Sequence, residues 1–75
     1  MTALFNLLKK LVSKIPFHKV GEFLKFAWDF AAAAAKKGAA ALKKITDFVK
    51  KNPGKIVDWF LKGYSLYEMF KMILG

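Results

Sequence analysis

The chain contains no cysteine and no arginine, and each absence excludes a kind of chemistry. Without Cys there is no disulfide, no thiolate metal site and no thiol nucleophile. Without Arg, the planar guanidinium that contacts bases and phosphates with two parallel hydrogen bonds is missing. The only histidine, His18, has no second His, no Cys and no unpaired carboxylate nearby that could complete a metal site. We therefore expect no metal and no cofactor.

Long apolar runs are absent as well. The longest stretch without a charged side chain covers residues 1–8, far short of the ~20 apolar residues that a membrane-spanning helix needs. The glycines stand apart from one another and form no phosphate-binding loop. Lys25 and Asp29 interrupt the only candidate apolar region of a secretory signal. We therefore expect a chain that begins at Met1 and has no leader to remove.

Acidic residues are few, and each of the five lies three or four positions from a lysine. This is the ordinary spacing of ion pairs on a solvated helix face, worth about 0.3–0.5 kcal/mol each. A carboxylate in such a pair is not free for acid–base chemistry, so we expect no catalytic residue and no enzyme. The residues concerned are Glu22, Asp29, Asp47, Asp58 and Glu68.

Lysine is the dominant charged residue. The 14 basic residues are all Lys and stand against five acidic residues, which gives a net charge of +9. Lys is a point charge suited to diffuse anionic surfaces, such as lipid headgroups or a nucleic-acid backbone bound without sequence preference. Composition alone leaves both partners open.

Apolar residues recur at helical spacing along the whole chain, with no strand-like alternation. The pattern predicts one all-α domain over residues 1–75, a compact bundle of about five short amphipathic helices. Proline and glycine mark the joints, because Pro cannot continue a helix and Gly suits its C-terminal end. The expected helices cover about 2–15, 17–37, 39–51, 53–63 and 65–74.

Two helix starts have recognisable capping residues. Asn52 precedes Pro53 and is expected to cap the helix that follows. The sequence SLYE fits the Ser-x-x-Glu capping box, in which Ser65 and Glu68 satisfy backbone N–H groups of the first turn. The side chains expected to face the core are Phe17, Val20, Phe23, Leu24, Ala27, Trp28 and Ala31 in the 17–37 helix, and Ile56, Val57, Phe60 and Leu61 in the 53–63 helix.

The two tryptophans, Trp28 and Trp59, lie toward the edges of their apolar stripes. At such a position an indole can either complete the edge of the core or lie at a membrane interface, and both interpretations stay open for Trp28. For Trp59 we favour the interface, because Lys55 and Lys62 lie on either side of it in the same short helix.

Three segments resemble the leaderless bacteriocins of the aureocin, lacticin and epidermicin group. They are LFNLLKKLVSK near the N-terminus, KNPGKIVDWFLKG in the C-terminal third, and the Lys-containing last helix that ends in KMILG. The resemblance covers about residues 3–14 and 37–74. It implies a saposin-like helical bundle that permeabilises bacterial membranes. Residues from about 16 to 36 look like an additional helix, and Pro53 stands where the family more often continues without proline.

We therefore expect a secreted antibacterial protein that binds anionic bacterial membrane lipids and makes the bilayer leak, as a monomer in solution and without a protein receptor. The expected membrane-binding residues are Lys9, Lys10, Lys14, Lys43, Lys44, Lys50, Lys51, Lys55, Lys62, Trp28 and Trp59. The alternative from another class is a small non-specific nucleic-acid-binding protein, which the charge favours and the lack of Arg disfavours. A circular bacteriocin is a further alternative, which an intact mass equal to that of the linear chain would exclude.

Overall fold

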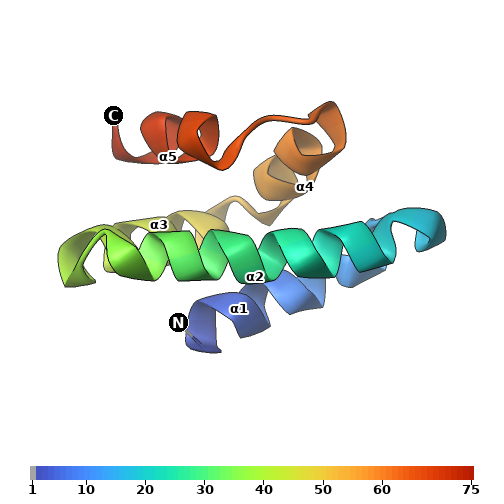
Figure 1. Cartoon of the computed structure of the whole chain (residues 1–75), viewed down its shortest axis with the longest axis horizontal. Coiled ribbons are helices and arrows are strands. Elements are labelled where there is room, and N and C mark those ends of the chain that lie inside the picture. The colour runs from blue at the N-terminus through green and yellow to red at the C-terminus, as the bar shows by residue number, and fades with distance from the viewer. Residues whose placement is uncertain (1) are drawn as a thin grey trace.

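The prolines and glycines that interrupt the apolar pattern divide the chain into short helices, as the computed structural model shows (Figure 1). The structure describes residues 2–75, with side chains from residue 3 onward. Within that range there are no strands, and the expected compact all-α globule of five α-helices is confirmed. The elements are α1 (Thr2–Lys9), η1 (Lys10–Lys14), η2 (Phe17–Lys19), α2 (Val20–Lys36), α3 (Ala39–Lys51), α4 (Pro53–Lys62) and α5 (Leu66–Leu74), where η denotes a 3-10 helix.

Pro16 shortens the first two expected helices. The residue before a proline is disfavoured in the α region, and Ile15 is extended, with φ −103° and ψ 136°. The expected helix over 2–15 is therefore α-helical only through α1 and tightens into η1. The helix expected from residue 17 likewise opens with η2, where the backbone N–H of Lys19 donates to the Pro16 carbonyl at 2.8 Å.

The core is centred on α2, which crosses the front of the molecule in Figure 1, with α1 below it, α3 behind it and α4 and α5 above it. Phe23 of α2 meets Phe60 of α4 with ring centroids 5.0 Å apart, and Phe26 meets the same ring at 5.1 Å. No buried side chain among residues 3–75 is polar or charged. The core is therefore held together by apolar packing alone.

The expected inward face of α2 is confirmed for Phe23, Ala27 and Ala31, which are fully buried, but three other residues expected to face the core do not do so. Phe17, just before α2, is 94% exposed, and Leu24 and Trp28 also lie at the surface, whereas Phe30 is fully buried. Because the large apolar residues of α2 cover a wide arc of the helix, helical spacing alone does not select which of them reach the core. In α4, Leu61 is 44% exposed and is likewise not a core residue.

The helix ends agree with the sequence at one of the two expected caps. Ser65 Oγ accepts from the N–H of Glu68 at 3.2 Å, and Glu68 Oε1 accepts from the N–H of Ser65 at 3.0 Å, which confirms the capping box. Asn52 was the wrong choice of cap, because its Nδ2 donates backward to the Phe48 carbonyl at 3.4 Å and no side-chain cap forms on α4.

Gly63 then turns the chain from α4 into the segment before α5. Its φ of 83° lies in the left-handed region, which glycine adopts without a steric penalty. The N–H groups of Gly63 and Tyr64 donate to the carbonyls of Phe60 and Trp59, both at 3.1 Å. This is the hydrogen-bond pattern of a Schellman motif, and it satisfies carbonyl groups at the end of α4.

Candidate membrane-binding surface

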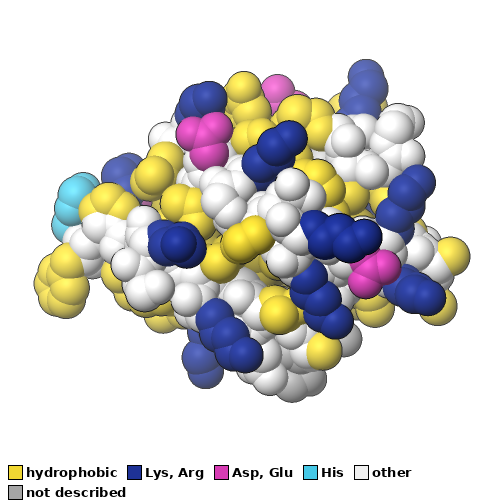
Figure 2. Space-filling model, turned by 180° about the vertical axis from the view of Figure 1, so that it is seen from behind, with side chains coloured by type: hydrophobic (Ala, Val, Ile, Leu, Met, Phe, Trp, Pro, Cys, Tyr) yellow, Lys and Arg dark blue, Asp and Glu magenta, His cyan; other side chains and the backbone are white. Residues whose placement is uncertain are grey.

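The nine lysines expected to contact lipid are all exposed. Their distribution along the fold is uneven, since α1, η1 and α3 carry seven of the nine and only one acidic residue, Asp47. The other two, Lys55 and Lys62, are on α4 together with Asp58. Figure 2, which views the molecule from the side where α3 lies, shows lysines spread over the whole face with apolar side chains between them. The structure therefore distributes these lysines over four elements rather than gathering them into a cluster.

The outward side of α3 carries charged residues and no large apolar side chain. Ile45 and Val49 are buried, and Leu42 and Phe48 pack against the core from the same helix. No large apolar residue of α3 is among the exposed ones. This helix can attract anionic headgroups, but it offers no exposed large side chain to insert below them. The exposed charged residues of α3 are Lys43, Lys44, Asp47, Lys50 and Lys51.

Trp28 is the more exposed of the two tryptophans, at 51%. Its indole and the Phe5 ring of α1 form a T-shaped pair, with centroids 5.4 Å apart and an angle of 83° between the planes. The ammonium of Lys9 lies 5.8 Å from the centroid of the same Phe5 ring. A cation and a half-exposed indole thus lie near the same aromatic side chain, an arrangement suited to the boundary between headgroups and acyl chains.

Trp59 has a different environment. Its indole is partly buried and stacks on Phe48 of α3, with centroids 5.4 Å apart and an angle of 12° between the planes. The Trp59 ring is therefore packed at the edge of the core. Its assignment as a membrane anchor stays a prediction.

One of the expected helix-face ion pairs is formed. Lys62 Nζ lies 3.0 Å from Asp58 Oδ2, with both side chains more than half exposed. The hydrogen bond to Asp58, followed by its charge and that of Tyr64, raises the pKa of Lys62 above its usual range. No other ion pair within 4.0 Å occurs in the part of the chain whose side chains are described, which corrects the expectation that every carboxylate is paired. An exposed pair gains little Coulomb energy in water and restricts two long side chains, so most such pairs do not hold one geometry.

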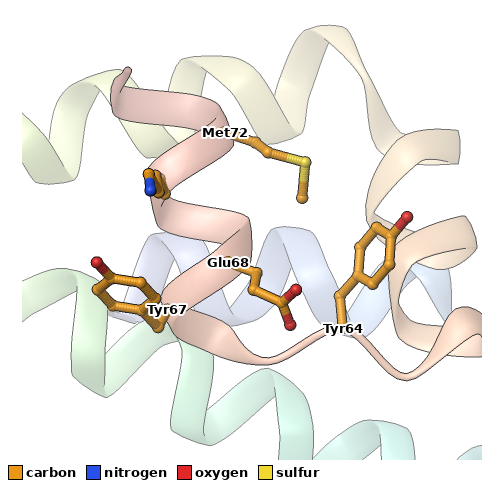
Figure 3. Close-up of a pocket in the computed structure, with 5 residues that line it drawn as sticks. Tyr64, Tyr67, Glu68 and Met72 are labelled. Carbon is orange, nitrogen blue, oxygen red and sulfur yellow. The ribbon is translucent and has the colours of Figure 1, made fainter.

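Glu68 serves the helix cap instead of pairing with Lys71. The hydrogen bond from the Ser65 backbone, followed by the one from its side chain, lowers the pKa of Glu68. Glu68 also lines an open hollow of ≈ 380 Å³, formed with Tyr64, Tyr67, Lys71 and Met72. Figure 3 shows Glu68, Met72 and Tyr64 on one side of α5 and Tyr67 on the other, so these groups do not converge on one point.

Two exposed aromatic side chains were missed by the sequence reasoning. Tyr67 is 75% exposed, and its place in α5 relative to the buried pair Met69 and Phe70 could have revealed this. The exposure of Phe17 had no comparable signal, because it depends on the turn made by η2.

Among residues 2–75, no three His, Cys, Asp or Glu side chains come together as a metal site would require. No helix in the same range has both the length and the apolar character needed to cross a bilayer.

Comparison with known proteins adds no relative, since no protein-family model, no curated protein and no solved structure matches the chain. The fold defines the structural class of the protein, which is a compact all-α globule of five helices.

Proposed function

We propose that the protein is a secreted antibacterial protein that binds anionic bacterial membranes through its lysines and permeabilises them, in the manner of the leaderless bacteriocins that its sequence resembles. The observation that carries this proposal is the half-exposed Trp28, held beside the cationic α1 by the ring of Phe5. A saposin-like arrangement of the helices is part of the same proposal.

Attraction is the first step of the proposed mechanism. A lysine close to an anionic membrane contributes about 1 kcal/mol, and the attraction fades over a Debye length of ~8 Å at physiological ionic strength. The net charge of +9 and the exposed lysines of α1, η1 and α3 supply this attraction without any single binding pocket.

Insertion is the second step. The helices are short and amphipathic, and helices of this kind bury their apolar side ~5–10 Å deep at the boundary between headgroups and acyl chains. Material added at that depth spreads the headgroups and disturbs the packing of the chains below. The bilayer then leaks although no helix crosses it.

Release of a trapped dye from lipid vesicles tests the proposal. Vesicles of phosphatidylglycerol should leak, those of phosphatidylcholine should leak far less, and leakage from the anionic vesicles should weaken as salt is raised from 0.1 to 1 M, because the Debye length falls from ~10 to ~3 Å. Equal leakage from both lipids would contradict the electrostatic step. Removal of the protein from anionic vesicles by a stoichiometric amount of duplex DNA would favour a non-specific nucleic-acid binder instead.

A further inference from the structure

The exposed side of the contact between α1 and α2 combines cationic and apolar groups within a few ångströms. We call it the Trp28 seam and define it by Phe5 and Lys9 of α1 and Leu24, Lys25 and Trp28 of α2. The two helices run in opposite directions in Figure 1. Leu24 precedes Trp28 by one helical turn, so both lie on the same side of α2, and Leu24 is 36% exposed.

Charges occur at both edges of this seam. The ammonium of Lys9 lies over the Phe5 ring on the α1 side, and exposed Lys25 follows Leu24 on the α2 side. Lysine side chains have long apolar stems that can lie along such a surface while the ammonium stays at the level of the phosphates. Of the two acidic residues of α2, Glu22 and Asp29, neither pairs with either lysine within 4.0 Å.

Other surfaces of residues 3–75 have lysines or exposed apolar side chains, but none of them has an exposed tryptophan. The outer side of α3 has lysines but no exposed large apolar side chain. The side of α5 has exposed Tyr67 and Met72, and Lys37 Nζ lies 5.3 Å from the centroid of the Phe70 ring, but no tryptophan lies in α5.

We propose that the protein docks on anionic bilayers with the Trp28 seam foremost, so that Trp28 and Leu24 enter the acyl boundary while Lys9 and Lys25 remain at the lipid phosphates. This orientation rests on the proposed membrane function and adds to it which face meets the lipid. The occupant of the surface is the anionic bilayer, because the cations at its edges complement lipid phosphates and its centre is apolar.

Two single-tryptophan proteins test the orientation. Trp59→Phe retains only Trp28, and Trp28→Phe retains only Trp59. With phosphatidylglycerol vesicles, emission from Trp28 should shift to the blue and be quenched by lipids that carry bromine on the acyl chains. Emission from Trp59 should change less, because its ring is already partly buried against Phe48. Stronger quenching of Trp59 than of Trp28 would overturn the proposal.

A matched pair of leucine variants gives a second readout. Leu24 lies in the seam, whereas Leu61 is on α4, and the two are similarly exposed at 36% and 44%. Leu24→Gln should raise the protein concentration needed for half-maximal leakage roughly tenfold, as expected for the loss of one inserted Leu side chain. Leu61→Gln should change it less than twofold. Equal effects of the two substitutions would refute the orientation.

Co-sedimentation with the same vesicles distinguishes a failure of the docking orientation from a failure of the membrane function. If the single-tryptophan proteins bind and cause leakage but Trp28 is not quenched, the orientation is wrong and the membrane function stands. If the unmodified protein does not sediment with anionic vesicles at all, the membrane function fails and the orientation fails with it.

Discussion

The ring of Phe30 lies 4.9 Å from the ring of Phe70, and this contact joins the middle of α2 to α5. Phe30 is fully buried and Phe70 nearly so. Closer to the N-terminus of α2, Phe23 and Phe26 contact the ring of Phe60 in α4. Aromatic rings of α2 thus contact both C-terminal helices.

Phe30→Ala should therefore unfold the protein or nearly do so. Truncating a buried Phe costs about 3–5 kcal/mol, which approaches the whole stability of a small domain. Phe17→Ala is the matched control, because that ring is 94% exposed and its loss should change the stability by less than about 0.5 kcal/mol. Circular dichroism during thermal unfolding measures both. A Phe30→Ala protein that melts with the unmodified protein would show that α2 does not organise the core.

Ser65→Ala should remove the side-chain half of the capping box. Such a loss costs about 1 kcal/mol, equivalent to a decrease of about 4–8 °C in melting temperature for a domain of this size. Ser13→Ala, at an exposed position in η1, serves as the control for replacing a serine. An unchanged melting temperature for Ser65→Ala would mean that α5 does not depend on this cap.

The stability should also depend on pH through Glu68. Its pKa is lowered from the ordinary value of 4.5 by hydrogen bonds from Ser65, so ionised Glu68 favours the folded state. This contribution is fully present above the ordinary value and is lost as the pH falls through the lowered value of the folded protein. Glu68→Gln should therefore be less stable than the unmodified protein near neutral pH, and the difference should shrink in acid. Melting temperatures measured from pH 7 down to pH 2 test this, and a difference that stays constant would contradict it.

Trp59→Ala should lower the stability of the protein. An aromatic pair contributes about 0.5–1.5 kcal/mol beyond the area that it buries, and Trp59 stacks on Phe48. Trp59→Phe should retain part of this contribution, since a ring still covers Phe48. Urea unfolding followed by circular dichroism gives the free energies. If Trp59→Ala were as stable as the unmodified protein while leakage fell, its role as a membrane anchor would be supported instead.

The sequence predicted the helices better than their orientations. The joints at Pro16, Gly38, Pro53 and Gly63 and the Ser65 cap are local, because each depends on the backbone preferences of one or two residues. The burial of Phe30, which the sequence did not predict, is not local, since its ring packs against Phe70 from a distant part of the chain.

Some features of the candidate membrane-binding surface could likewise be predicted from the sequence, and others could not. The exposure of the lysines follows from composition, because an ammonium is rarely buried without a partner. The difference between Trp28 and Trp59 does not follow from it. Both indoles occupy similar positions in their helices, and only the contacts with Phe5 and Phe48 on neighbouring helices distinguish them.

The absence of buried polar side chains among residues 3–75 affects how easily the helices can separate on a bilayer. In water, separating the helices exposes apolar surface and is opposed by the hydrophobic effect. Among acyl chains the hydrophobic effect no longer opposes this separation, because the lipid tails are as apolar as the leucine and phenylalanine side chains of the core. No buried side-chain hydrogen bond or ion pair has to be broken as the helices part. The same core therefore favours a closed globule in water but opposes only weakly the separation of the helices within a membrane.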